Sequence, residues 1–263
     1  MDIFEFTPGR TPLLISIPHG GTWLPPALRP RLTEAALALP DTDWHVPRLY
    51  AFAAALGAGV LAATHSRYVI DLNRPPDDEP LYPGARNTEL VPLTLFDERP
   101  VYRPGAAPDD VEVRDRLGTY WQPYHSKIET ELGALRERFG IALLFDAHSI
   151  RSVVPRFFEG RLPDLNLGTA AGGSAAATLG STLSSIAESG SYSAVLNGRF
   201  KGGYITRHYG RPDRNIHAVQ LELSQRTYMD EEPPFAWRQD LAEGIQPLLR
   251  RLVEAMIAWA GRL

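Results

Sequence analysis

Two histidines of this chain each end an apolar run. His19 closes "LLISIPH" and is followed by Gly20 and Gly21, while His148 closes "IALLFDAH". Short apolar runs bounded by turn residues are typical of buried strands, and neutral imidazole is a common metal ligand. We therefore take both histidines as candidate metal ligands, and expect the glycines to clear room for a bound ion. The alternative for either histidine is a hydrogen-bonded side chain at a strand end.

Several aspartates could complete a metal site with these histidines. Asp146 precedes His148 by two residues, which places both on one face of a strand. It can accept the far ring N–H of a metal-bound histidine or bind the metal itself. Asp41 and Asp43 precede a predicted helix, where aspartate commonly caps the first turn. Because hydrolytic zinc is usually held by three protein ligands, one of these aspartates is the candidate third ligand, and we favour Asp43.

A fourth carboxylate, Glu222, lies within the apolar run "HAVQLELS". It shares a strand face with Gln220 and Ser224, and an unpaired carboxylate in such a place is costly. A carboxylate beside a metal can activate a metal-bound water as general base, so Glu222 is the candidate catalytic residue. The alternative is a salt bridge with a basic residue such as Arg226.

Two segments interleave arginine with glycine and aromatic residues, namely "SRYVIDLNR" and "NGRFKGGYITRHYGRP". Guanidinium groups bind carboxylates through two parallel hydrogen bonds, so these segments suit a small acidic substrate. Arg74 and Arg207 are the candidates for the substrate carboxylates, with surface charge as the alternative. Ser149 follows His148, but no G-x-S-x-G elbow accompanies it and no base is marked for it.

Composition narrows the classes of protein further. The chain has 263 residues, no cysteine, and 27 basic against 31 acidic residues, giving a net charge of −4. These values exclude disulfides and thiolate ligands and do not fit a general nucleic-acid binder. No apolar run is long enough to span a membrane, and "MDIFEFTPGR" does not resemble a signal peptide. We expect a cytoplasmic protein with a small-molecule partner, and both a monomer and a homo-oligomer stay open.

Strand-like and helix-like segments alternate along the chain. Helical periodicity marks residues 46–59, the stretch from 110 to 140 interrupted by Pro123, and the C-terminal segment. Residues 73–92 and 166–185 are loop-like, although the end of the second stretch could equally be a helix of small residues. This order predicts an α/β fold with a mixed, mostly parallel sheet in one domain, residues 1–263. Whether residues 75–108 form a lid is left open. The expected strands are 12–18, 59–64, 68–72, 141–148, 193–197 and 217–224.

Seven segments, in order through almost the whole chain, resemble those of N-formylglutamate amidohydrolases. This family is related more distantly to zinc carboxypeptidase-like and aspartoacylase-like enzymes. The block from residue 197 to 212 is the most specific. The matching segments are "SIPHGGTWLP", "DTDWHVPRLYAFA", "RYVIDLNRPPD", "LFDAHSI", "LPDLNLGT", "NGRFKGGYITRHYGRP" and "QLELSQRTYMDE".

The resemblance implies a three-layer fold of the zinc-exopeptidase type. It also implies hydrolysis of N-formyl-L-glutamate to formate and L-glutamate, a step of histidine degradation, with zinc or another divalent metal. His19 and His148 then correspond to the histidine ligands and Glu222 to the general base that activates the metal-bound water. Asn73 and Arg74 correspond to a pair that grips a substrate carboxylate.

One position departs from the pattern of the wider superfamily. That superfamily takes a metal ligand from a glutamate three residues after the first histidine, and here that residue is Thr22. An aspartate from residues 41–43 must therefore replace it, and Asp43 is our assignment. Two other functions stay open: an amidohydrolase for another N-acyl or N-formyl amino acid, and a non-catalytic protein that binds an acidic metabolite.

Overall fold

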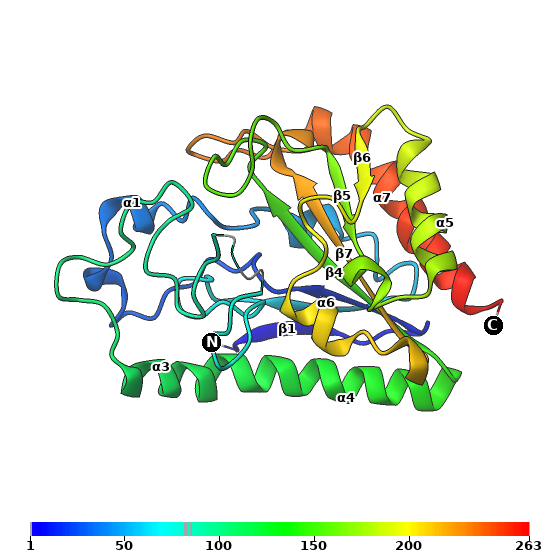
Figure 1. The fold of residues 1–263 in the computed structure, drawn as a ribbon, viewed down its shortest axis with the longest axis horizontal. Coiled ribbons are helices and arrows are strands. Elements are labelled where there is room, and N and C mark those ends of the chain that lie inside the picture. Colours follow the sequence, from blue (N-terminus) through cyan, green and yellow to red (C-terminus); the bar gives the residue numbers. More distant parts are fainter. Residues whose placement is uncertain (1, 82–83, 85, 263) are drawn as a thin grey trace.

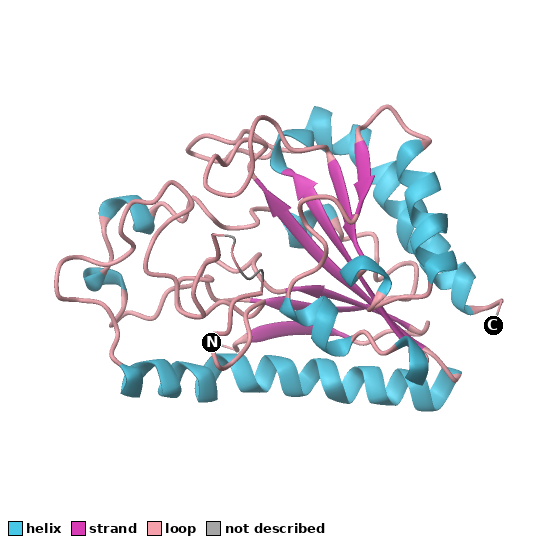
Figure 2. Ribbon diagram, in the orientation of Figure 1, coloured by secondary structure: helices cyan, strands magenta, loops and turns pink. Residues whose placement is uncertain are grey.

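The computed structural model describes residues 2–81, 84 and 86–262, and within them one sheet forms the centre of the molecule (Figures 1 and 2). Its strand order is β1-β3-β2-β4-β7-β5-β6. Strand β2 pairs in parallel with β3 and β4, β4 with β7, and β5 with β6; β1–β3 and β5–β7 are antiparallel. The strands are β1 (Phe4–Thr7), β2 (Leu13–Ile17), β3 (Gly59–Ala63), β4 (Ala142–Ile150), β5 (Leu165–Gly168), β6 (Ala194–Leu196) and β7 (Ile216–Ser224).

Helices cover both faces of this sheet, so the predicted three-layer α/β fold is confirmed. Strand β4 shows why, because Leu143, Phe145 and Ala147 enter the core with α5 and α7, while Leu144 points to the core with α4. A π-helical turn, Leu117–Trp121, links α3 to α4 along the lower edge of Figure 1. The helices are α1 (Glu34–Leu37), α2 (Val46–Leu49), α3 (Asp110–Arg116), α4 (Gln122–Phe139), α5 (Ala177–Glu188), α6 (Tyr204–Tyr209) and α7 (Gln239–Ala260), with 3-10 turns at Arg29–Arg31, Ala170–Gly172, Pro212–Arg214 and Gln225–Thr227.

The strand predictions are confirmed except at residues 68–72. That segment is buried but lies in turns, where the N–H of Val69 bonds to Ser66 O and the N–H of Asp71 to Leu90 O. The carbonyl of Val69 accepts a hydrogen bond from Arg116 of α3. Backbone groups that a neighbouring strand would have bonded are thus bonded by a side chain and by loop residues. Strands β1 and β5 were not predicted. Residues 166–185, expected to be loop-like or to end in a helix, hold most of β5 and the start of α5.

The helix predicted over residues 46–59 is also shorter than expected. Only α2 is α-helical, and residues 50–57 continue as turns that end at Gly57 with φ +85°. The carbonyl of Gly57 accepts the N–H groups of Arg10 and Thr11, which ties this segment to the chain before β2. Pro123 lies in the first turn of α4, directly after the π-helical turn, so the helical run continues through it with a local change of hydrogen-bond pattern. Among the described helices, none has the length and apolar character needed to cross a membrane.

Candidate metal centre and active site

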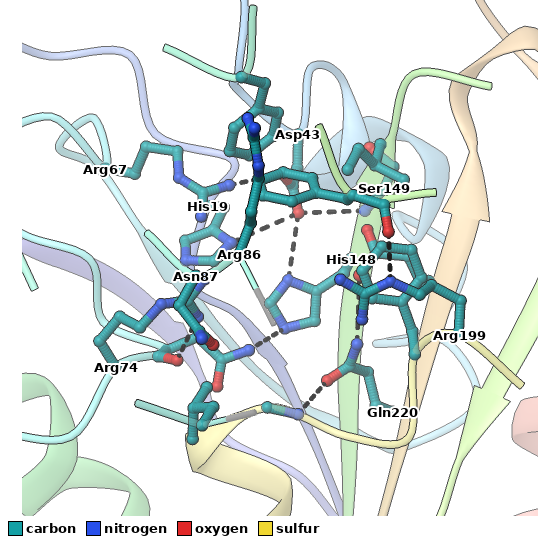
Figure 3. A pocket seen from close by; sticks show the side chains of 18 residues that line it. His19, Asp43, Arg67, Arg74, Arg86, Asn87, His148, Ser149, Arg199 and Gln220 are labelled. Atoms are coloured by element: carbon teal, nitrogen blue, oxygen red, sulfur yellow. Dashed lines mark hydrogen bonds and ion pairs between the residues drawn. The ribbon is translucent and has the colours of Figure 1, made fainter. Parts of the chain in front are cut away.

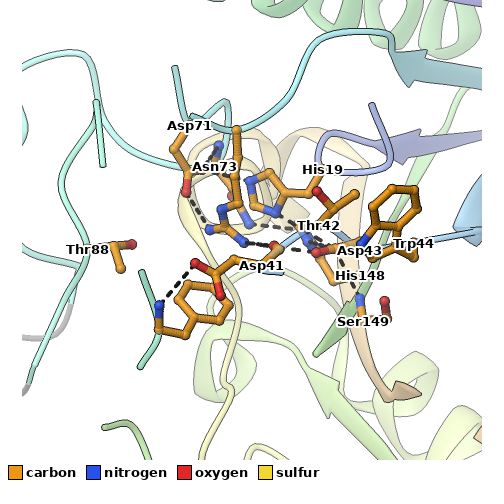
Figure 4. A network of polar contacts seen from close by, with 12 residues as sticks. His19, Asp41, Thr42, Asp43, Trp44, Asp71, Asn73, Thr88, His148 and Ser149 are labelled. Atoms are coloured by element: carbon orange, nitrogen blue, oxygen red, sulfur yellow. Dashed lines mark hydrogen bonds and ion pairs between the residues drawn. The ribbon is translucent and has the colours of Figure 1, made fainter. Parts of the chain in front are cut away.

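Three side chains converge where the carboxyl ends of β2 and β4 meet. His19 lies just beyond β2, His148 lies near the end of β4, and Asp43 comes from the loop before α2 (Figure 4). All three are buried, with exposed fractions of 3%, 2% and 2% for His19, His148 and Asp43. One nitrogen or oxygen atom from each lies within 4.8 Å of the other two. The structure thus brings together the three residues that the sequence suggested as metal ligands.

The spacing of these atoms suits a small divalent ion. Tetrahedral zinc with bonds of about 2.0–2.1 Å holds neighbouring ligand atoms about 3.3 Å apart. Here Asp43 Oδ2 lies 3.2 Å from His148 Nδ1 and 3.7 Å from His19 Nδ1. Imidazole nitrogen with carboxylate oxygen is also a donor set that zinc and related divalent metals accept. The residues present therefore fit a metal site.

Each histidine has a carboxylate behind it, on the side away from the cluster. His19 Nε2 lies 2.7 Å from Asp71 Oδ1, and His148 Nε2 lies 3.1 Å from Asp146 Oδ2. At His19 a carboxylate at Nε2 favours the tautomer with the proton there, and the Nδ1 atoms of both histidines face Asp43. Asp146 thus lies where its predicted supporting role requires, whereas the sequence analysis did not single out Asp71.

The charges around this cluster shift its ionisation. Burial lowers the pKa of His19, and nearby Arg67 lowers it further. Burial opposes protonation of His148 as well, but Asp146 and Asp43 outweigh that effect and raise its pKa well above the ordinary value. Burial alone would raise the pKa of Asp71, yet Arg67 and His19 hold it well below its usual range. Asp71 is therefore a carboxylate anion shared between a cation and a histidine.

Asp43 has hydrogen bonds that fix it beside both histidines. Its Oδ2 accepts the N–H of Ser149 at 3.0 Å, and its own N–H donates to the carbonyl of His19 at 3.1 Å. The residue at the N-cap of α2 is His45, in the left-handed region with φ 63°, so Asp43 does not cap this helix. The capping alternative is excluded for Asp43 by this geometry.

Asp41, the rival third ligand, faces a different set of partners. Its Oδ2 accepts the hydroxyl of Tyr68 at 2.8 Å and the N–H of Phe96 at 3.0 Å. Burial raises the pKa of Asp41, although its contact with Tyr68 opposes this. Asp41 is not part of the histidine–aspartate cluster.

Glu222 lies beside the cluster because of the register between β4 and β7. That register pairs His148 with Glu222 and Asp146 with Gln220. Gln220 accepts the N–H of Gly203 at 2.6 Å and donates to Glu222 Oε2 at 3.1 Å, which orients the carboxylate. Burial raises the pKa of Glu222 to about 8, while the charge of His148 opposes the shift.

The salt bridge considered as the alternative role of Glu222 is not formed with Arg226. Arg226 pairs with Asp164 instead. Ser149, the other uncertain residue of this region, directs its Oγ toward the Tyr228 hydroxyl at 2.7 Å and Gln225 Nε2 at 3.3 Å. Neither partner is a general base, so the geometry gives Ser149 no means of activation as a nucleophile.

The glycines after His19 serve packing rather than the ion. A Cβ on Gly20 would lie 2.9 Å from the Pro47 ring, and one on Gly21 would lie 2.4 Å from the carbonyl oxygen of His65. The expectation that they clear room for a metal is therefore wrong, because neighbouring chain fills that space. Thr22 is exposed, consistent with a third ligand from elsewhere.

A pocket opens above the cluster, and its wall combines cationic with aromatic side chains (Figure 3). Glu222, Asn73 and the three cluster residues line it together with these groups. Positive charge around a metal site favours a small anionic ligand. The cationic and aromatic residues are Arg67, Arg74, Arg86, Arg199, Phe96, Phe157 and Phe200.

Of the three predicted substrate-binding residues, Asn73 and Arg74 line the pocket and Arg207 does not. Asn73 Nδ2 lies 3.0 Å from His148 Nε2, and Asn73 Oδ1 accepts the N–H of Ile205. Arg74 lines the pocket beside Asn73. Arg207 does not line this pocket, and its Nε donates to the carbonyl of Gly202 on the same segment at 2.7 Å. Arg199 is the arginine of that segment that lines the pocket.

The family model for N-formylglutamate amidohydrolase matches residues 11–229 of this chain. The chain belongs to this family. N-formylglutamate deformylase of Pseudomonas aeruginosa is 58% identical over 259 residues, which cover 98% of this chain and 97% of that protein. N-formylglutamate deformylase of Pseudomonas putida is 55% identical over 258 residues, which cover 98% and 96% of the two chains.

Solved structures share the fold of this N-formylglutamate amidohydrolase family member. The crystal structure of N-formylglutamate amidohydrolase from Ralstonia eutropha matches with a TM-score of 0.85 at 24% identity, covering 100% of this chain and 99% of that one. A protein from Agrobacterium tumefaciens matches with a TM-score of 0.72 at 18% identity, covering 97% and 95%. At these identities the likeness establishes the three-layer architecture alone.

Proposed function

We propose that this protein hydrolyses N-formyl-L-glutamate to formate and L-glutamate, as a step of histidine degradation. The observation that carries the proposal is the 58% identity with a deformylase over 98% of the chain. The buried cluster of possible metal ligands in an arginine-lined pocket also supports it, because such a site suits hydrolysis of a small anionic amide. We further propose that residues 1–263 act as one amidohydrolase domain, since a single sheet carries the cluster and Glu222.

His19, Asp43 and His148 would hold the divalent metal, zinc or a related ion. Such an ion supplies Lewis acidity, which polarises the formyl carbonyl and makes water more acidic. Asp71 keeps the Nε2 proton on His19 and so keeps its Nδ1 available as a ligand atom, and Asp146 places a carboxylate 3.1 Å from His148 Nε2.

Glu222 acts as general base. Its carboxylate takes a proton from the attacking water as the oxygen–carbon bond forms at the formyl group. The same proton passes to the amide nitrogen as the carbon–nitrogen bond breaks, which releases formate and the amine of glutamate. The hydrogen bond from Gln220 holds Glu222 for this transfer.

Arg67 and Arg74 provide positive charge on the pocket wall. Arg67 Nη1 lies 3.9 Å from Asp43 Oδ1, close enough to the cluster to stabilise the negative charge that develops on the formyl oxygen. Arg74 binds a substrate carboxylate. Formyl is the smallest acyl group, so a narrow space beside the cluster admits it and rejects larger acyl groups.

The test measures formate or acetate release by the purified protein from three compounds, N-formyl-L-glutamate, N-formyl-L-aspartate and N-acetyl-L-glutamate. We expect the highest kcat/KM on N-formyl-L-glutamate, with loss of activity on chelation and recovery when zinc is added. A higher kcat/KM on either other compound would make that compound the substrate. Binding of N-formyl-L-glutamate without turnover in the presence of zinc would favour a non-catalytic binding protein.

A further inference from the structure

The pocket wall carries more positive charge than a single carboxylate requires. Of its arginines, Arg67 forms an ion pair with Asp71 beside the cluster. Arg86 pairs with Glu98 and its side chain is 62% exposed. Arg74 and Arg199 line the same wall, and a glutamate derivative offers two carboxylates. The inference below rests on the proposed function and concerns which arginine recognises which carboxylate.

Arg74 and Arg199 reach the pocket from opposite ends of the sheet. Arg74 lies in the chain after β3, whereas Arg199 follows β6, the strand at the far edge. Figure 3 shows the two side chains entering from opposite sides, with His148 between them. A substrate whose amide is held at the cluster therefore has a guanidinium group on either side.

Hydrogen bonds to neutral oxygens hold both guanidinium groups in place. Arg74 donates from Nε and Nη2 to the carbonyl and hydroxyl of Thr88 at 2.9 and 2.6 Å. Arg199 donates from Nε to the carbonyl of Phe157 at 2.5 Å. These acceptors orient the two side chains, and a guanidinium group that is already oriented suits the recognition of an anion.

The chemistry of the substrate decides the assignment. The α-carboxylate is attached to the carbon that bears the amide nitrogen, so it must bind close to the cluster. Arg74 meets this condition because it lines the pocket together with the three cluster residues, directly after Asn73, whose amide contacts the His148 ring. The second carboxylate lies beyond two methylene groups, and the aromatic rings of Phe157 and Phe200 next to Arg199 offer those methylenes an apolar wall.

We infer that Arg199 recognises the side-chain carboxylate of the substrate and makes the enzyme selective for dicarboxylic N-formyl amino acids. Arg74 then recognises the α-carboxylate that every N-formyl amino acid carries. In this arrangement Arg199, and not Arg207, is the specificity-determining arginine of the segment "NGRFKGGYITR".

The experiment compares N-formyl-L-glutamate with N-formyl-L-glutamine, which has the same shape but a neutral side-chain amide. The readout is the ratio of the two kcat/KM values on one protein sample, so the fraction of folded enzyme cancels. We expect Arg199→Met to lower this ratio about 10- to 100-fold, the value of a lost charge-assisted hydrogen bond. Arg199→Lys should lie between, and Arg74→Met should lower both kcat/KM values while the ratio stays nearly constant.

Two further variants complete the test. Arg214→Met removes an exposed arginine outside the pocket and should change neither the activity nor the ratio. Arg207→Met tests the rival residue. An unchanged ratio in Arg199→Met, or a fall of the ratio in Arg207→Met alone, would overturn the inference while wild-type turnover still supported the proposed function. No wild-type hydrolysis of N-formyl-L-glutamate would overturn both.

Discussion

Replacing Asp71 with asparagine should weaken metal binding although Asp71 is not itself a ligand. Its Oδ1 lies 2.7 Å from His19 Nε2 and accepts the N–H of Asn73 at 2.8 Å, and its Oδ2 accepts a bond from Arg67. In Asp71→Asn one of these oxygens becomes an NH₂ group, which donates and cannot accept. Carboxylates behind metal-bound histidines typically contribute 10- to 100-fold in metal affinity, or about 1.4–2.7 kcal/mol.

The assay is a zinc titration of the metal-free protein against a chelator of known affinity, with unfolding followed with and without zinc. Because zinc binds the folded state, the stabilisation that zinc gives to Asp71→Asn should be smaller by the same amount, about 1.4–2.7 kcal/mol. Asp41→Asn is the matched control, since Asp41 is also buried nearby but contacts Tyr68 and Phe96. Unchanged zinc affinity in Asp71→Asn, or equal weakening in Asp41→Asn, would refute this reasoning.

Three further predictions concern catalysis, pH and packing. Glu222→Gln should lower formate release about 10²- to 10⁴-fold, the usual contribution of a general base, and leave zinc bound. Burial lowers the pKa of His125 in the folded protein to about 3, whereas its pKa in the unfolded chain is about 6.5. Between these two pH values only the unfolded chain takes up this proton, so stability falls as the pH falls. Urea unfolding should therefore show that His125→Gln loses about 2 kcal/mol less than the wild type between pH 7 and pH 5. Gly21→Ala should cost about 1–3 kcal/mol in unfolding free energy, because its Cβ would meet the His65 carbonyl oxygen at 2.4 Å.

Each of these predictions has an outcome that contradicts it. Normal turnover in Glu222→Gln would remove this residue from the chemistry, and loss of zinc would give it a structural role instead. Parallel pH profiles for the wild type and His125→Gln would show that His125 is protonated in the folded state. For the glycine, Gly133→Ala in α4 is the control, because no atom lies within 4 Å of its added Cβ; equal effects of the two substitutions would disprove the packing argument.

The sequence predicts the centre of the fold better than its connections. Strands β2, β4 and β7 are apolar runs covered on both faces, and such runs point to buried strands directly. The run at residues 68–72 is just as buried, yet Arg116, 47 residues along the chain from Val69, satisfies a carbonyl there. An apolar pattern reports burial and does not report which group will accept or donate the backbone hydrogen bonds.

The same limit applies to the site. His19 and His148 could be found because each ends an apolar strand. Asp71 could not, since its carboxylate reaches the ring of His19 across 52 residues only after the loop folds back. Sequence spacing also failed to separate Arg199 from Arg207, because a glycine-rich segment has no fixed periodicity that would assign one arginine to the pocket.

The pairing of β2 with β4 also bears on how the protein is made. Leu13 lies opposite Leu143, so the first central strand waits during synthesis for a partner that emerges about 130 residues later. Until then β2 can pair with β3 on one side only, and its other edge is a template for association with other chains. The ribosome-bound chain thus cannot bring His19 and His148 together before β4 appears, which is after more than half of the protein has been translated.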